Sequence, residues 1–406
     1  MTATATATAV PAVPMRRAVL TISATRVVTS LGFYLSIPML GVIALRGGAM
    51  SAADVGLLVA THALFRRAFS IPLGIACDRW GARPMLVGGL CAETIAYVLL
   101  ASGTSFPLWL GALVVDGLGG AAYNAGARLL LARVAQGNAA SSFAGFYVAT
   151  NLGALFGPLA AAALSGAGHP ALPLALSAGA YGISTVAGFL VTRRIADGTN
   201  PGARFGKAVL APLRHRSFMG YCASTVPLWF GVSLLVSALP LEGELRGLSA
   251  YDVAVVNALN ALVVVALGGV VGRRADGWST AARLRVLSAG SLAMSAGSLV
   301  CLAPGRPGLY GGLLLVTVGE LALITAADVV AVQLAPPGET GAYLGYVTFA
   351  WAVGGVTAGV LAGRLLDVPG SGTTLFWLIS AALGLAGAAA LLRRSVRVGG
   401  AAHGTA

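Results

Sequence analysis

Residues 134–192 read VAQGNAASSFAGFYVATNLGALFGPLAAAALSGAGHPALPLALSAGAYGISTVAGFLVT and contain no Asp, Glu, Lys or Arg. Further uncharged runs lie on both sides of this stretch. They are Val27–Leu45, Thr94–Val115, Ser217–Leu241, Val253–Gly272, Val286–Gly305, Thr340–Gly363 and Val368–Leu392. A helix needs roughly 20 apolar residues to cross the hydrocarbon core of a bilayer. Each run is therefore long enough for at least one crossing.

The composition of the whole chain supports the same conclusion. Of 406 residues, 57% are hydrophobic and 10% are charged, and the mean hydropathy is +0.86. Soluble domains carry about 25% charged residues. A membrane β-barrel would show short stretches of alternating apolar and polar residues instead of long apolar runs. The sequence predicts an all-α integral membrane protein.

Several kinds of chemistry lack their sequence motifs. The single lysine, Lys207, has Pro201 and Ala208 at the positions where a phosphate-binding loop needs Gly and Ser or Thr. The 4 cysteines form no CxxC pair, and neither HExxH nor GxSxG occurs. We therefore expect no enzymatic activity, no cofactor and no metal site.

Cutting the chain at charges, Pro and Gly predicts twelve membrane spans. Their limits are residues 17–45, 54–77, 84–101, 106–130, 142–164, 173–192, 218–241, 251–272, 286–303, 309–334, 342–366 and 373–392. An even number of spans places both termini on one side of the membrane.

The basic residues predict which side that is. If the N-terminus is inside, the external loops hold only Arg46, Arg246 and Arg306. The cytoplasmic segments then hold Arg16, Arg17, Arg79, Arg83, Arg128, Arg133, Arg193, Arg194, Arg204, Lys207, Arg214, Arg216, Arg273, Arg274, Arg283, Arg285, Arg393, Arg394 and Arg397. The positive-inside rule thus predicts cytoplasmic termini. The net charge of +13 is a topology signal that suits the anionic inner leaflet and does not indicate nucleic-acid binding.

The predicted organisation has five parts. Residues 1–15 form a Thr-Ala-rich disordered tail without the pattern of a signal peptide, residues 16–192 and 218–392 form two six-helix bundles, residues 193–217 form a cytoplasmic linker, and residues 393–406 form a cytoplasmic tail. The preference for Arg, Ala and Gly suggests a GC-rich bacterial genome, so we expect the protein to lie in the inner (plasma) membrane. We expect it to be a monomer.

A weak internal repeat agrees with the division into two bundles. Four residue pairs are separated by the same distance along the chain. They are Gly74 and Gly272, Asp78 and Asp276, Trp80 and Trp278, and Gly157 and Gly355. When a transporter consists of two repeats of six spans in the same orientation, the substrate path lies at the interface between the repeats, near the middle of the bilayer.

Two motifs carry a family resemblance. Residues 74–83, GIACDRWGAR, resemble the loop 2–3 signature GxxxDRxGR(R/K) of the major facilitator superfamily, with Ala82 at one basic position. Residues 153–158, GALFGP, resemble the GxxxGPxxGG motif of its drug:proton antiporters, with Ala161 and Ala162 in place of the last glycines. Leu113 occupies the position of that branch's span 4 Arg. The resemblance implies twelve helices in two pseudo-symmetric halves, with spans 1, 4, 7 and 10 around a central cavity.

The same motifs supply candidate gating residues. They are Gly74, Asp78, Arg79, Gly81, Arg83, Gly153, Gly157 and Pro158. The resemblance implies that Asp78 faces the start of span 11 near Gly341, because free N–H groups at a helix start attract anions. The alternatives are a charged loop that only sets topology, and a span 5 motif that only allows close packing.

Ionisable residues inside spans cost a few kcal/mol each unless they are paired or hydrated, and therefore mark function. Asp116, near the middle of span 4, is our candidate for proton coupling, with Glu320 in span 10 as second choice. Glu93 is expected to be a structural partner of a neighbouring span. Asp328 is either a gate or a solvated residue.

The candidate substrate-binding residues are charged, polar or aromatic side chains of the expected cavity. They are Arg26, Tyr34, His62, Arg66, Arg67, Tyr123, Asn124, Tyr147, Asn151, Trp229, Thr317 and Trp351. Arg66 and Arg67 point about 100° apart on a helix, so only one can face the cavity squarely. For each aromatic residue, core or lipid-facing packing is the alternative.

These features predict a secondary transporter that exports a drug-like or metabolite-like small organic molecule in exchange for protons, by alternating access, as in multidrug efflux. The expected partners are the substrate, protons and the lipid bilayer. A proton symporter that imports a small solute is the alternative within transport. A membrane receptor or scaffold on the same fold is the alternative outside transport, although such a protein has no use for costly buried carboxylates.

Overall fold

A computed structural model describes residues 15–46, 50–135, 137–166, 172–193, 195, 197, 199, 205–366, 368 and 370–403. Within these ranges the elements are helices. Their bounds are α1 (Met15–Arg46), α2 (Ala52–Ala68), α3 (Ser70–Trp80), α4 (Ala82–Ser102), α5 (Phe106–Val134), α6 (Ala139–Gly166), α7 (Leu172–Thr192), α8 (Phe205–Arg214), α9 (Arg216–Ser237), α10 (Leu239–Leu245), α11 (Ala250–Ala275), α12 (Thr280–Val300), α13 (Gly305–Leu334), α14 (Thr340–Leu365) and α15 (Gly372–His403). The expected disordered tail lies outside the described residues, apart from Met15.

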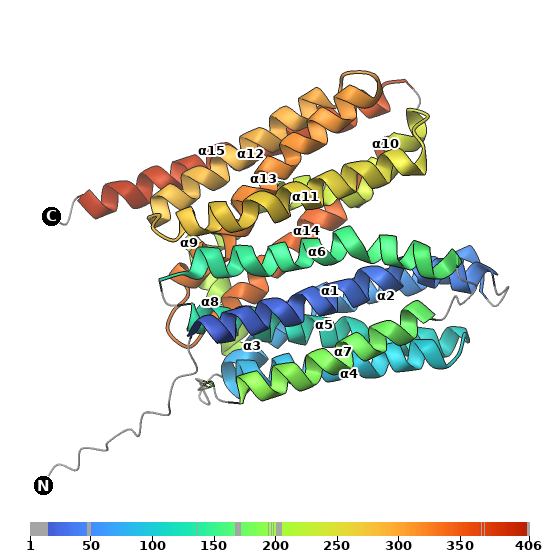
Figure 1. Ribbon diagram of the computed structural model, residues 1–406. Coiled ribbons are helices and arrows are strands. Elements are labelled where there is room, and N and C mark those ends of the chain that lie inside the picture. Colours follow the sequence, from blue (N-terminus) through green and yellow to red (C-terminus); the bar gives the residue numbers. More distant parts are fainter. Residues whose placement is uncertain are drawn as a thin grey trace, which may run out of the picture.

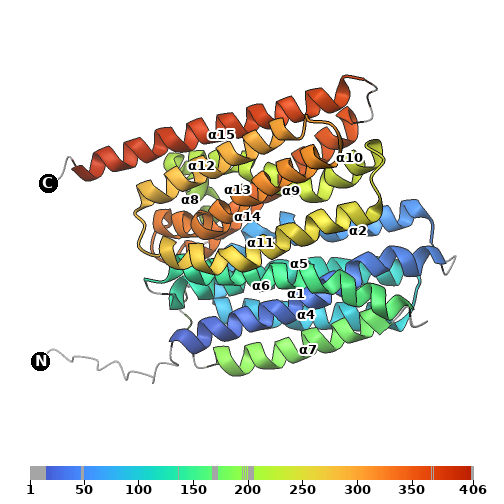
Figure 2. The ribbon, with the colours of Figure 1, turned by 45° about the horizontal axis from the view of Figure 1, so that its top comes forward.

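The helices form two packed groups (Figures 1 and 2), which we call the N-half (α1–α7) and the C-half (α9–α15). Each half has its own large hydrophobic cluster, centred on side chains such as Trp109 and Tyr97 in the N-half and Trp377 and Phe376 in the C-half. α1 begins and α15 ends at the same end of the molecule (Figure 1). We call this end the terminal face and the opposite end the far face.

Among the described residues, ten helices are long and apolar enough to cross a membrane: α1, α4, α5, α6, α7, α9, α11, α13, α14 and α15. The predicted all-α, multi-pass architecture is confirmed. The other two predicted spans correspond to the α2–α3 pair and to α12, which do not meet the same criteria of length and composition.

The predicted continuous span 54–77 is wrong in one respect, because it is two helices that meet at Phe69. The cause is Pro72, in the first turn of α3. Proline has no N–H to donate to the carbonyl of Ala68, and its ring clashes with that carbonyl. α2 therefore ends at Ala68, and α3 begins two residues later.

Other predicted boundaries also need correction. The linker 193–217 contains the helix α8, and the short helix α10 follows α9. The predicted tail from residue 393 is helical as far as His403, because α15 continues past the last apolar residues. α5 continues to Val134, past the predicted limit at residue 130.

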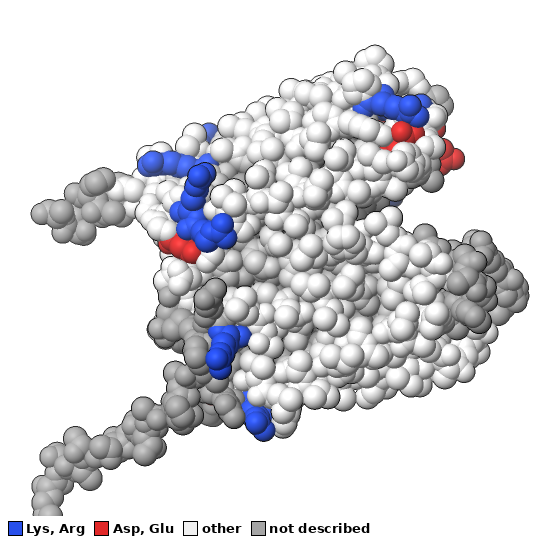
Figure 3. All heavy atoms as spheres, in the orientation of Figure 1, with Lys and Arg blue, Asp and Glu red and all other residues white. Residues whose placement is uncertain are grey.

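Basic side chains gather at the terminal face. On the side shown in Figure 3, most visible Lys and Arg side chains lie at the end where α1 begins and α15 ends, with few at the far face. The outline in the same view is notched between the two halves at the far face. The halves thus meet closely at one end only.

Small residues allow α4 and α5 to pack with their backbones close together. A Cβ atom added to Gly89 would overlap the backbone of Tyr123 and Gly119, and one added to Gly126 would lie 2.5 Å from the backbone nitrogen of Leu86. The neighbouring Gly88 faces outward, where an added Cβ would meet no atom within 4 Å. Such close backbone contact is typical of helix pairs in membranes.

Gly89→Ala should destabilise the protein by about 1–3 kcal/mol, because an extra methyl group in a tight contact forces the helices apart. Gly88→Ala, one residue away, should leave stability unchanged or slightly improved, since Ala has the higher helix propensity. Thermal unfolding of both variants in detergent checks this expectation. Equal unfolding temperatures would show that the α4–α5 contact is not as tight as described.

Candidate functional site

Asp78, near the end of α3, joins the halves at the terminal face. The backbone N–H groups of Gly341 and Ala342, at the start of α14, donate hydrogen bonds of 2.8 Å to its Oδ1 and Oδ2. The predicted contact between Asp78 and the start of span 11 is confirmed. Gly74 makes it possible, because a Cβ there would overlap the carbonyl of Gly341.

Asp78 lies beyond the predicted membrane span 54–77, and its pKa is raised to about 6. Burial is the largest cause, while the hydrogen bonds from Ala342 and Gly341 act in the opposite direction. At neutral pH the carboxyl group is mostly ionised and can accept both bonds.

Asp276 makes the corresponding contact from the C-half. It follows α11, and its Oδ1 accepts a 3.0 Å bond from the backbone N–H of Ser141 in the first turn of α6. Gly272 packs against this helix start, where an added Cβ would lie 2.6 Å from the Ala144 Cβ. The internal repeat therefore corresponds to two related contacts, each joining a carboxylate of one half to a helix start of the other.

A buried ion pair forms a third connection between the halves. Nε of Arg128 in α5 donates a 2.9 Å bond to Oδ2 of Asp328 in α13, and a second guanidinium nitrogen contacts the other oxygen. Arg128 also donates to the hydroxyl of Thr348 in α14. The prediction left Asp328 open between gate and solvated residue, and the buried pairing fits the gate. Sequence reasoning missed this role of Arg128, which it had counted only among the basic residues of the cytoplasmic side.

The two basic residues of the loop signature lie elsewhere. Arg79 stacks on Trp80, 6.0 Å from its centroid, and Arg83 stacks on Phe189, 5.1 Å away. Among the described residues, neither side chain bonds to the C-half. They take no part in the contact that Asp78 makes with α14, and their gating role stays a prediction.

Gly81 instead organises the start of α4. Its positive φ of 106° favours glycine, and the following N–H groups of Ala82 and Arg83 donate to the Asp197 carboxylate at 2.8 and 3.0 Å. Arg133 also pairs with Asp197, at 3.0 Å. Sequence reasoning missed Asp197, because the linker has no pattern that places it near α4.

The span 5 motif packs within the N-half. A Cβ added to Gly153 would overlap Ser30, and one added to Gly157 would lie 2.5 Å from the Tyr34 Cβ, both in α1. Pro158 is exposed, and α6 continues through it. In this conformation the motif serves close packing between α1 and α6.

Four ionisable side chains form a buried group inside the N-half, which we call the N-half ion cluster: His62, Arg66, Glu93 and Asp116. His62 Nε2 lies 2.9 Å from Asp116 Oδ2, and Arg66 donates a 3.1 Å bond to Glu93. Asp116 and Glu93 are both 0% exposed. The predicted structural pairing of Glu93 is confirmed, but the expectation that solute could reach Asp116 is wrong for this conformation.

A second set of side chains lies between the halves. The Tyr34 phenol is within electrostatic reach of Arg26, Arg66, Arg67 and Glu320, and Tyr147 is within reach of Asp328, Arg128, Arg26 and Glu320. We call Tyr34, Tyr147, Arg26, Arg67 and Glu320 the central site, because the other three residues belong to the N-half ion cluster or to the Arg128–Asp328 pair. The central-site residues come from α1, α2 and α6 of the N-half and α13 of the C-half, as a substrate path between repeats requires.

Arg26 is held in place within the central site. Its Nε donates to the Thr150 hydroxyl at 2.7 Å and its Nη1 to the Asn124 side chain at 3.1 Å, while Phe146 lies under the guanidinium at 4.8 Å. No carboxylate among the described residues forms an ion pair with Arg26. Its positive charge is therefore available to a solute.

Arg67 connects the central site to a pair of tryptophans. Its guanidinium lies 4.4 Å from the Trp351 ring centroid, and Trp351 stacks on Trp229 at 5.1 Å. The described residues give Arg67 no hydrogen bond and no carboxylate partner. Arg66 and Arg67 thus divide as expected, with Arg66 buried in a pair and Arg67 toward the interface.

Glu320 presents the only central-site carboxylate among the described residues. Asn260 of α11 donates to its Oε2 at 2.7 Å and to the Thr317 hydroxyl at 3.0 Å. Thr317 is fully buried, so it supports Asn260 and does not line the path. Asn260 was missed in the sequence because an uncharged residue in an apolar run gives no signal of its partner.

Some predicted binding residues do not line the central site. Tyr123 is 0% exposed and packs inside the N-half. His62 belongs to the N-half ion cluster, as does Arg66. Each of these three residues lies on a helix that lines the interface but points to the core of the N-half. Asn151 donates to the carbonyl of Tyr147, one turn earlier in α6.

The helices that meet at the terminal face separate toward the far face. Ser70 of α3 donates to the Gly345 carbonyl at 3.2 Å near the terminal end of α14. With the notch in Figure 3, this describes a molecule closed at the terminal face and open toward the far face.

A multi-pass helical protein whose two halves share related contacts at one face and enclose charged groups at their interface has the architecture of a secondary transporter. A profile described as the Major Facilitator Superfamily matches residues 22–359. The chain belongs to this superfamily, which confirms the resemblance of residues 74–83.

Two relatives show how far the sequence similarity extends. The chain is 26% identical over 217 residues to an uncharacterised MFS-type transporter of Mycobacterium tuberculosis, covering 53% of this chain and 52% of the relative. It thus spans about half the length of that relative. It is 24% identical over 344 residues to the multidrug resistance protein MdtH of Aeromonas salmonicida, covering 83% and 84% of the two chains.

Solved structures share the fold. The human organic anion transporter MFSD10 (TETRAN) matches with a TM-score of 0.78 and 16% identity, over 94% of this chain and 100% of that one. FucP in its outward conformation matches with a TM-score of 0.75 and 15% identity, over 94% and 98%. At these identities the likeness defines the fold and not the substrate.

Asp78→Asn should weaken the closure of the terminal face. The amide has one acceptor oxygen, so it can accept only one of the two N–H bonds that the carboxylate accepts. Spin labels at exposed Arg193 in the N-half and Arg285 in the C-half, in a Cys91→Ser background, should report a longer or broader distance distribution than in the parent. Asp54→Asn is the matched control, because Asp54 caps its own helix α2 through Ser51. An unchanged distribution in Asp78→Asn would exclude a gating role for this carboxylate.

Proposed function

We propose that this protein is a proton-coupled exporter of a small organic molecule in a bacterial inner membrane, with the terminal face in the cytoplasm. The His62–Asp116 pair of the N-half ion cluster carries this proposal, because ionisable side chains buried within membrane-spanning helices are costly and mark proton pathways. The multidrug resistance protein among the relatives and the span 5 motif support export. Closure of the terminal face corresponds to the state that faces outward.

Asp116 is the proposed coupling group. With His62 protonated, the two side chains form a neutral pair, whereas loss of that proton leaves a carboxylate charge without its partner in a fully buried position. Removing one partner of a buried pair costs about 3–5 kcal/mol. A change in solvent access to this pair would therefore change its proton affinity, which is how protonation can bias a two-state carrier.

The proposed substrate position is the central site with its tryptophan pair. Tyr34, Tyr147 and Trp351 supply apolar and aromatic surface, and Arg26, Arg67 and Glu320 supply charge. This mixture suits an amphipathic organic solute. Residues of both halves contribute, so binding would stabilise particular relative positions of the halves.

A second candidate function is proton-coupled uptake of an anionic solute. It is favoured by one observation, that Arg26 and Arg67 lack carboxylate partners among the described residues. An anion and a proton attract one another, so their binding is mutually favourable and suits movement in the same direction. A cation that competes with a proton for Glu320 suits exchange.

The Asp116→Asn variant should bind substrate but fail to concentrate it in response to a pH gradient. In proteoliposomes, one proton per substrate and a gradient of one pH unit support at most about tenfold accumulation, because one unit is worth about 1.4 kcal/mol. The probes are fluorescent dyes of cationic, zwitterionic and anionic charge, measured with and without the gradient and beside equilibrium binding.

Glu320→Gln is the comparison variant, because it removes the second carboxylate candidate and keeps the side chain's shape. If Asp116→Asn still accumulates dye while Glu320→Gln does not, the coupling role passes to Glu320. Accumulation of an anionic dye in the same direction as proton flow would favour uptake over export. Wild-type protein that moves no dye under either gradient would contradict proton-driven transport of such molecules.

A further inference from the structure

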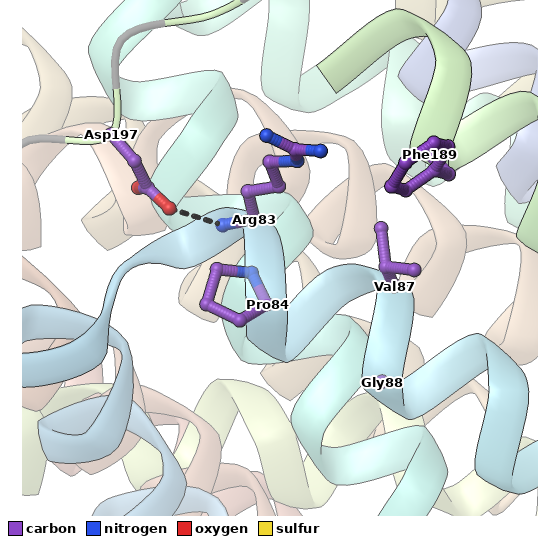
Figure 4. Close-up of a pocket in the computed structure, with 6 residues that line it drawn as sticks. All are labelled: Arg83, Pro84, Val87, Gly88, Phe189 and Asp197. Atoms are coloured by element: carbon purple, nitrogen blue, oxygen red, sulfur yellow. Dashed lines mark hydrogen bonds between the residues drawn. The ribbon is translucent and has the colours of Figure 1, made fainter. Parts of the chain in front are cut away.

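A groove on the outer surface of the N-half is separate from the central site. It lies between the start of α4 and the end of α7 and has a volume of about 390 Å³ (Figure 4). Its lining residues are Arg83, Pro84, Val87, Gly88, Phe189 and Asp197. It faces away from the C-half, so it belongs to no part of the proposed substrate path.

The upper end of the groove carries an available positive charge. The Asp197 carboxylate is already bound by the N–H groups of Ala82 and Arg83 and by the Arg133 guanidinium. The Arg83 guanidinium stacks on Phe189 and has no carboxylate partner within the described residues. Arginine stays charged at any relevant pH, so this end of the groove attracts an anion.

The lower end of the groove is apolar and open. Val87 and Gly88 lie about one helical turn beyond Arg83 on α4, and Phe189 on α7 is 46% exposed. A Cβ at Gly88 would meet no atom within 4 Å, so the glycine leaves a slot in the surface. In Figure 4, the Val87 side chain points toward Phe189, which lies beside the Arg83 side chain.

The two ends of the groove lie at different depths in the membrane. α4 and α7 are both long and apolar enough to span the bilayer. Arg83 lies in the first turn of α4, and Phe189 lies in the last turn of α7. The charge is therefore at the level where the helices leave the hydrocarbon region, and the apolar slot continues into it.

We propose that this groove binds an anionic phospholipid, with its phosphate on Arg83 and the upper part of an acyl chain along Val87, Gly88 and Phe189. A cation above an apolar slot matches the sequence of groups in such a lipid. A headgroup with net negative charge is favoured, because Arg133 and two backbone N–H groups already bind the Asp197 carboxylate and the terminal face is rich in arginine. This proposal does not depend on the transported substrate.

Native mass spectrometry of the purified full chain with added phosphatidylglycerol tests the site. Arg83→Gln should weaken lipid retention about fivefold, since one basic residue near a lipid surface is worth about 1 kcal/mol. Arg83→Lys should retain most of the binding, and Gly88→Leu should reduce it by filling the slot. Arg285→Gln is the control, because Arg285 is exposed on the C-half and away from the groove.

The remaining arms separate a lipid from other ligands. Phosphatidylcholine should bind more weakly than phosphatidylglycerol, and glycerol 3-phosphate should not displace the bound lipid. Displacement by glycerol 3-phosphate would show recognition of phosphate alone and overturn the lipid assignment. Equal retention of phosphatidylglycerol by Arg83→Gln and Arg285→Gln would also overturn it, provided that both variants unfold at the parent's temperature.

Discussion

A carboxylate at the start of a helix from the opposite half is the interaction on which this arrangement depends. Asp78 accepts the N–H groups of Gly341 and Ala342, and Asp276 accepts that of Ser141. Both contacts require a glycine one turn before the carboxylate, so that backbones can approach. They act beside apolar contacts between the halves, in which Ala275 and Val329 of the C-half pack into the N-half cluster. The buried pair of Arg128 and Asp328 adds a third polar connection on the same side.

The cost of burying charge explains the division between the two groups of ionisable residues. Inside the N-half, Glu93 pairs with Arg66, and the Asp116 carboxylate lies 2.9 Å from the His62 imidazole, so each of these buried carboxylates has a basic side chain beside it. At the interface, Arg26 rests on neutral and aromatic partners and Glu320 on Asn260. Partial hydration or a solute must complete the environment of these groups. The N-half ion cluster is therefore paired internally, whereas the charged groups of the central site have no ion pair among the described residues.

The sequence alone predicts the helical fold, its internal repeat and one of the contacts between the halves. Long uncharged runs predict the helices, and the repeated Asp78 and Asp276 predict related positions in the two halves. Motif resemblance gives the family and the contact of Asp78 with the start of α14. A break such as that at Phe69 was also within reach, since Pro72 cannot continue the preceding helix.

The remaining features depend on helix rotation and on partners distant in the sequence. In a chain of nearly uniform apolarity, no periodic pattern shows whether Tyr123 points to the interface or into its own half. Nothing local shows that Arg128 meets Asp328, or that Asn260 supports Glu320. Asp197 lies in a polar linker and acts on a helix start 115 residues earlier. These pairings are set by how helices pack, which only the three-dimensional structure shows.

Hydrogen–deuterium exchange in proteoliposomes, with and without an imposed proton gradient, shows whether the contacts of Asp78 and Asp276 with the opposite half open and close together. The peptides to follow contain Ser141 and Gly341–Ala342, whose N–H groups bind carboxylates of the other half. The internal reference is Ala82–Arg83, whose N–H groups bind Asp197 within the N-half. We expect the gradient to change hydrogen exchange at the starts of α6 and α14 together and to leave exchange at the start of α4 unchanged. Exchange that stays constant at all three helix starts, or that changes at only one inter-half contact, would contradict this expectation.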